Sequence, residues 1–224
     1  HGLIEDEPLL TITADKLVNS AKEAIAVGKQ LGDKVILMAT STGGTLALYL
    51  AGGDPDIAGL LLYSPNIEIF DSNAKLLTKP WGVQLAKLVK GGDYHEFEDP
   101  SEADRQYWTT KYRVEALAQL QVLMDETMTE ETFQSVRQPL FLGYYYKDEI
   151  HQDSTVSVSA MLGMFEELGT PVDQKRKVAF PNVSEHVMTS YITSKDLESV
   201  KRETNRFMEE VLGLKPQLTV GSGG

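Results

Sequence analysis

The chain has 224 residues, of which 42% are hydrophobic and 24% are charged, and its formal net charge is -12 at pH 7. A chain of this length can bury one sizeable core, so we expect a single domain of the α/β class. The acidic balance argues against binding to a phosphate backbone, which needs clustered Lys and Arg, and the lack of cysteine excludes disulfides and thiolate zinc sites.

The first part of the chain has the pattern of a strand–helix–strand unit. Residues 13–31 place apolar side chains on one helical face, and Gly32 follows them. An apolar strand begins at Val35 and changes at a small polar cluster into a helix that ends near Gly52. A second apolar strand covers residues 57–63. This spacing predicts parallel strands joined by a right-handed crossover.

The middle of the chain, residues 67–136, has a different pattern. We find no buried strand there and expect helical pieces over residues 74–88, 102–111, 114–124 and 129–136. An inserted helical cap explains this interruption best. Most of its large side chains are expected to pack within the cap, while Trp81, Trp108 and Met124 are candidates for substrate contacts.

The sheet pattern returns after the insertion. We expect strands over residues 139–146 and 177–180, and helices over 154–168 and 195–212. The predicted core therefore comprises residues 1–66 and 137–216, as a mostly parallel sheet flanked by helices. Residues 217–224 include Gly-Ser-Gly-Gly and have the composition of a flexible linker or tail.

Ser41 lies at the turn between the first strand and the next helix. Ala39 precedes it by two residues and Gly43 follows by two, so the stretch is close to the G-x-S-x-G nucleophile elbow. In such an elbow, small neighbours allow a sharp turn that lifts the serine hydroxyl above the sheet. A simpler interpretation is a polar turn in which Ser41 only caps the helix.

Two further polar residues follow predicted strands. Asp148 comes directly after the strand at 139–146, and His186 lies in the loop after 177–180. The carboxyl ends of parallel strands meet at one crevice, so Ser41, Asp148 and His186 are expected to converge. A serine hydroxyl needs an imidazole to remove its proton, and the imidazole needs a carboxylate to orient it.

Other residues compete for these roles. Glu149 or Asp153 could replace Asp148 as the acid, although Asp148 comes first after the strand. His151 precedes a helix and is expected at the surface or the edge of a pocket. His95 lies in an acidic run that is expected to be exposed.

The order Ser, acid, His and the elbow Ala39-Thr-Ser-Thr-Gly43 resemble the α/β-hydrolase superfamily, within it the carboxylesterase and monoacylglycerol-lipase-like group. The resemblance covers almost the whole chain after His1. It implies that Ser41 is the nucleophile, His186 the general base and then acid, and Asp148 the orienting carboxylate. The backbone N–H of Thr42 would be one oxyanion donor.

The beginning of the chain departs from this family. His1-Gly2 stands too close to Ser41 for the oxyanion loop, and it matches instead a Gly-His-Gly that follows a later strand. The resemblance then implies that N-terminal strands and a second oxyanion donor lie outside this chain, in a missing segment or a companion polypeptide.

These features predict a serine hydrolase that cleaves a carboxylic ester with an apolar group, acting on a small-molecule or lipid-like substrate. No metal or organic cofactor is implied, because the histidines lack metal-ligand spacing. No apolar run reaches the roughly 18 residues of a membrane span, so we expect no stable membrane insertion and a cytoplasmic location. The alternatives are an amide or carbon–carbon hydrolase or an acyltransferase with the same triad, and a non-catalytic binding or sensor protein of the same fold.

Overall fold

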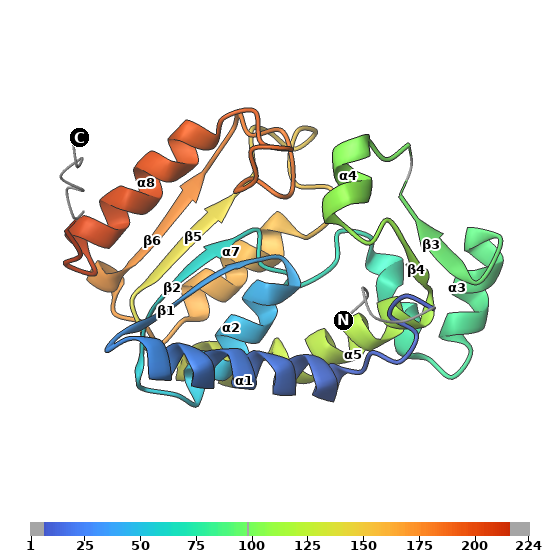
Figure 1. The fold of residues 1–224 in the computed structure, drawn as a ribbon, viewed down its shortest axis with the longest axis horizontal. Coiled ribbons are helices and arrows are strands. Elements are labelled where there is room, and N and C mark those ends of the chain that lie inside the picture. The colour runs from blue at the N-terminus through green and yellow to red at the C-terminus, as the bar shows by residue number, and fades with distance from the viewer. Residues whose placement is uncertain (1–6, 98, 216–224) are drawn as a thin grey trace, which may run out of the picture.

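The computed structural model describes residues 7–97 and 99–215. Its central sheet has four parallel strands in the order β1-β2-β5-β6. Their bounds are β1 Val35–Thr40, β2 Ile57–Tyr63, β5 Leu140–Tyr144 and β6 Lys175–Ala179. All four predicted strands are confirmed, and so is the mostly parallel sheet flanked by helices (Figure 1).

Helices lie on both faces of this sheet (Figure 1). One face is packed by α2 (Thr42–Gly52), α6 (Glu130–Ser135) and α7 (Val158–Glu167), and the other by α8 (Leu197–Glu210). The long helix α1 (Ala14–Leu31) contacts α2, β1 and α5 (Glu115–Thr127). The α7 helix begins four residues later than expected, because the segment before it forms a turn around Asp153.

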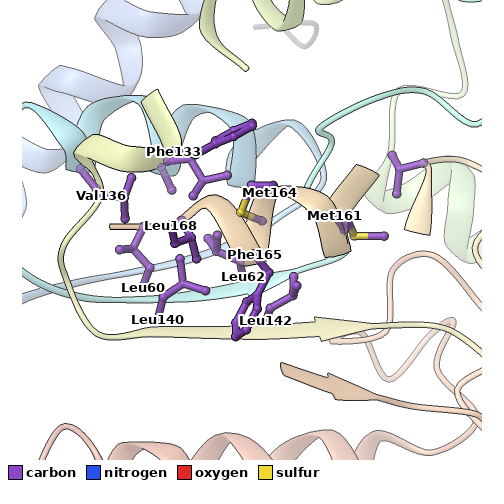
Figure 2. Packing of buried hydrophobic residues seen from close by; sticks show 14 of the residues in the cluster. Leu60, Leu62, Phe133, Val136, Leu140, Leu142, Met161, Met164, Phe165 and Leu168 are labelled. Atoms are coloured by element: carbon purple, nitrogen blue, oxygen red, sulfur yellow. The ribbon is translucent and has the colours of Figure 1, made fainter. Parts of the chain in front are cut away.

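The alternation of side chains along the strands builds the two cores. In β2, Leu60 and Leu62 face α2 and α7, whereas Leu61 and Tyr63 face α8. Figure 2 shows the first of these cores, where Leu60, Leu62, Leu140 and Leu142 meet Phe133, Val136 and the apolar side of α7. Strands buried on both faces read as continuous apolar runs, which is why β2 and β5 are apolar throughout.

The segment between β2 and β5 is not purely helical. It contains η1 (Ser72–Thr78), α3 (Gly82–Lys90), α4 (Glu102–Tyr107) and α5, together with β3 (Tyr94–Glu96) and β4 (Lys111–Arg113). The last two form an antiparallel ribbon that lies away from the central sheet (Figure 1). The helix expected over residues 74–88 is divided near Pro80, since proline disrupts a helix interior.

The first strand forms one edge of the described sheet, and Met38 in it is 62% exposed. The residues on which the prediction about His1-Gly2 rests, and those of the C-terminal tail from 216 on, lie outside the described residues. Among the residues that are described, no helix combines the length and the apolar character that crossing a bilayer requires.

Candidate active site

Ser41 occupies a sharp turn between β1 and α2. Its φ is 55° and its ψ is -126°, a conformation that costs a non-glycine residue about 1 to 3 kcal/mol. The surroundings hold it there. Its N–H donates to the carbonyl of Tyr63 (3.2 Å), and its carbonyl accepts from the N–H groups of Gly44 (2.8 Å) and Asn66 (3.0 Å). A strained serine fixed by backbone bonds on both sides is what an elbow requires.

Small residues make this turn possible. Ala39 stands where the elbow pattern has its first glycine. Its Cβ would lie 3.5 Å from a Cβ built on Gly43, which is ordinary contact, so the methyl group of Ala39 fits in this turn. A Cβ on Gly44 would lie 2.5 Å from the Cβ of Pro65, so only glycine lets the start of α2 approach the end of β2 this closely.

His186 follows β6 and is oriented by a buried carboxylate. Its Nδ1 lies 2.8 Å from Oδ2 of Asp153, and the two side chains are 15% and 0% exposed. Its other ring nitrogen, Nε2, is buried and has no hydrogen-bond partner within the part of the chain that is described. Thr40, next to Ser41, is 3.4 Å from Thr189 between their hydroxyl oxygens, so the histidine loop contacts the elbow strand.

The carboxylate that the structure places against His186 is Asp153 and not Asp148. Asp148 is half exposed and pairs with His151, whose Nδ1 lies 2.8 Å from its Oδ1. The prediction that Asp148 orients His186 is therefore wrong. Asp153, one of the two alternative acids in the sequence, contacts the histidine instead. The surface location expected for His151 agrees with its 58% exposure.

The loop after β5 explains this exchange. It turns back on itself, with the N–H of Lys147 bonded to the carbonyl of His151 (2.9 Å) and a bridge between Tyr146 and Gln152. The return brings Asp153 back to the strand, where its N–H donates to the carbonyl of Tyr145 (3.2 Å). Asp148, first in sequence, is left at the tip of the loop.

Asp153 is held as an ionised acceptor. Its Oδ1 accepts the N–H groups of Thr155 (2.9 Å) and Val156 (3.1 Å). Burial opposes ionisation, but the hydrogen bond and charge of His186, together with the N–H of Thr155, outweigh it and hold the pKa of the Asp153 carboxyl below its usual range. Such a carboxylate fixes the tautomer of the imidazole and favours its protonated form.

A cavity of about 520 Å³ opens beside the elbow and extends into the segment between β2 and β5. Ser41 and Thr42 line one part of it. Most of the remaining wall is aliphatic and comes from the β2 loop, η1, α3 and α5, with Ile69, Leu76, Leu77, Leu85, Leu117 and Leu120 among its residues. A pocket of this composition suits an apolar group.

The aromatic candidates from the sequence have other positions. Trp81 is 52% exposed at the start of α3, Trp108 stacks edge-to-face with Tyr107 at the end of α4, and Met124 is buried in α5. None of the three is among the described residues that line the cavity. Sequence inspection could not single out the aliphatic residues that do line it, because they follow the same helical periodicity as core residues.

Metal ions in proteins are commonly held by clusters of histidine and carboxylate side chains. Across residues 7–97 and 99–215, no group of three or more such side chains has a spacing that could hold a metal ion.

Comparisons with known proteins bear on the fold. No protein-family model and no curated protein matches the sequence. Among solved structures, a metagenome-derived lipolytic enzyme has a TM-score of 0.71 at 16% identity, over 90% of this chain and 76% of that one. A monoacylglycerol lipase from Paleococcus ferrophilus has a TM-score of 0.61 at 16% identity, over 88% of this chain and 75% of that one.

A soluble variant of monoglyceride lipase from Saccharomyces cerevisiae is a third similar structure. Its TM-score is 0.59 at 12% identity, over 87% of this chain and 68% of that one. These likenesses concern the fold, and they agree with a mostly parallel sheet flanked by helices. The chain has the α/β-hydrolase fold.

Proposed function

We propose that this protein is a serine hydrolase that cleaves a carboxylic ester with an apolar acyl group through an acyl-enzyme. The observation that carries the proposal is the position of Ser41, which is held at positive φ between β1 and α2 and lines an apolar cavity. The His186–Asp153 pair, joined at 2.8 Å, supplies the base and its orienting carboxylate. The similar structures include lipases and an esterase, which supports the same reaction class.

The reaction divides into two halves on these side chains. In the first, the Oγ of Ser41 bonds to the ester carbon while its proton passes to Nε2 of His186. The carbonyl π electrons move to oxygen, and their return expels the alcohol, which takes the proton from His186. In the second, water repeats these steps on the acyl-enzyme and releases the acid and Ser41.

The oxyanion needs donors that point at the place where its charge forms. Thr42 is the first residue of α2, so its N–H has no acceptor within the helix and can meet that oxygen. One such donor contributes about 10² to 10³ in rate.

The segment formed by residues 67–136 acts in this proposal as the cap over the acyl group. Its elements supply the aliphatic wall of the cavity, while α2 and the loop after β2 supply the part next to Ser41. The substrate is accordingly a small-molecule or lipid-like ester.

Hydrolysis of p-nitrophenyl esters of increasing acyl length tests the proposal. Ser41→Ala should lower kcat by about 10⁴ to 10⁶, because Ser41 is the proposed nucleophile that forms the acyl-enzyme. Ser159→Ala, a substitution of an exposed serine on α7, should leave the rate unchanged. Equal hydrolysis by the wild type and Ser41→Ala would overturn the proposal.

Labelling by a fluorophosphonate separates the enzyme from its alternatives. An active serine hydrolase reacts covalently at Ser41, and Ser41→Ala does not. A non-catalytic binding or sensor protein of the same fold would remain unlabelled in the wild type. Amides and thioesters of the preferred acyl chain, assayed beside the ester, distinguish ester hydrolysis from the other reactions that the same triad could perform.

A further inference from the structure

The cavity that contains Ser41 also has a polar region on the β3–β4 ribbon. His95 of β3 and Tyr112 of β4 are paired across the ribbon, and both line the cavity. Their rings lie 5.1 Å apart between centroids. The ribbon lies away from the central sheet and next to α3 (Figure 1), and aliphatic side chains of η1, α3 and α5 line the same cavity.

One nitrogen of this pair is buried without a partner among the described residues. Nδ1 of His95 is buried and has no hydrogen-bond partner within residues 7–97 and 99–215. The ring of Tyr112 packs against that of His95, and both residues line the cavity. A buried polar atom without a partner is costly, and such atoms are rare enough in folded proteins to require an explanation.

Both groups are neutral at physiological pH. Burial, and secondarily the charge of Lys90, lowers the pKa of His95, and burial raises the pKa of Tyr112 to about 12. A neutral imidazole has one donor and one acceptor nitrogen, and a tyrosine hydroxyl both donates and accepts. A hydroxyl on the ligand complements this set, whereas a methyl group leaves it unmatched.

The proposed function assigns this cavity to the acyl side of the ester, because in the acyl-enzyme the acyl chain remains bonded to Ser41 after the alcohol departs. From these observations we propose that His95 and Tyr112 form a specificity site for an acyl chain that carries a hydroxyl group at its distal end. This inference rests on the proposed ester hydrolysis.

The test compares two series of p-nitrophenyl esters, ω-hydroxyacyl and unsubstituted acyl, at equal chain lengths. At the chain length that reaches the ribbon, wild type should show about tenfold higher kcat/KM for the hydroxylated ester, since a site built to bind a hydroxyl rejects the analogue without it. Tyr112→Phe and His95→Leu should each reduce that ratio about three- to tenfold.

A matched control keeps the test specific. Tyr107→Phe changes an exposed tyrosine of α4 that does not line the cavity, so it should leave the ratio unchanged. Tyr112→Phe retains the half-buried ring, and its melting temperature shows whether the fold is preserved. A preference for hydroxylated chains that survives both cavity variants overturns the inference, and so does the absence of any preference in the wild type. Failure to hydrolyse either series overturns the proposed function instead.

Discussion

Two aspartate–histidine pairs with the same separation lie in one region of this protein. Asp153 and His186 are 2.8 Å apart with side chains 0% and 15% exposed, and Asp148 and His151 are 2.8 Å apart with side chains 49% and 58% exposed. The two separations are equal and the burial differs, and from this difference we infer that only the first pair is suited to act on Ser41. Burial removes competing water from the first pair and leaves a histidine nitrogen free to act, whereas solvent screens the second.

Replacing each histidine in turn should give the largest difference in kcat between the two pairs. His186→Gln should lower kcat for the preferred ester by about 10⁴ to 10⁶, because Ser41 then has no base. His151→Gln should leave kcat within about twofold of wild type, since an exposed side chain at the loop tip contacts no reacting atom. Steady-state kinetics on the p-nitrophenyl panel measure both values. Equal losses would contradict the assignment.

Substitution of the two aspartates should give the next largest difference in kcat. Asp153→Asn should lower kcat by about 10⁴, because an amide can hold the wrong tautomer of His186 and cannot stabilise its charged form. Asp148→Asn should have little effect on kcat. A large loss of kcat for Asp148→Asn, with little loss for Asp153→Asn, would instead support Asp148 as the orienting carboxylate.

The buried pair should also make folding stability depend on pH. Because the hydrogen bond from His186 holds the pKa of Asp153 low in the folded protein despite burial, ionised Asp153 stabilises the fold at neutral pH. That contribution is present above about pH 4, the unfolded pKa, and is lost as pH falls through the lower folded pKa.

Asp153→Asn removes this contribution and should lower the free energy of unfolding by about 1 to 3 kcal/mol at neutral pH. Urea unfolding of wild type and variant at several pH values measures the difference, which should narrow toward about pH 3. A difference that stays constant over this range would show that Asp153 does not act through its charge.

Substitution in the exposed pair, Asp148 and His151, should have the smallest effect on stability. The backbone N–H of His151, followed by its ring, lowers the pKa of Asp148, but both side chains are in water and an exposed ion pair contributes little. Asp148→Asn should change the melting temperature less than Asp153→Asn does, and the change should shrink in high salt. Thermal unfolding at low and high salt checks this, and a salt-independent loss as large as that of Asp153→Asn would contradict it.

The sequence by itself determined the sheet and the turn that carries Ser41. Apolar runs such as residues 57–63 predict buried parallel strands because their pattern is local, and Ala39 and Gly43 mark the elbow because a sharp turn needs small neighbours at fixed spacing. The sequence also pointed to His186, since it lies in the loop that follows the last strand. These features depend on residues that are close in the chain.

Contacts between distant segments determine which carboxylate meets His186 and which residues line the cavity beside Ser41. Asp148 precedes Asp153 in the chain, but the loop returns to β5 and places Asp153, not Asp148, beside the histidine. Likewise, His95 belongs to an acidic run that reads as exposed, yet the pairing of β3 with β4 turns it into the cavity beside Tyr112. The positions of Asp153 and His95 both depend on contacts between segments that are distant in the chain. The free energies of such contacts cannot be predicted from a local sequence pattern.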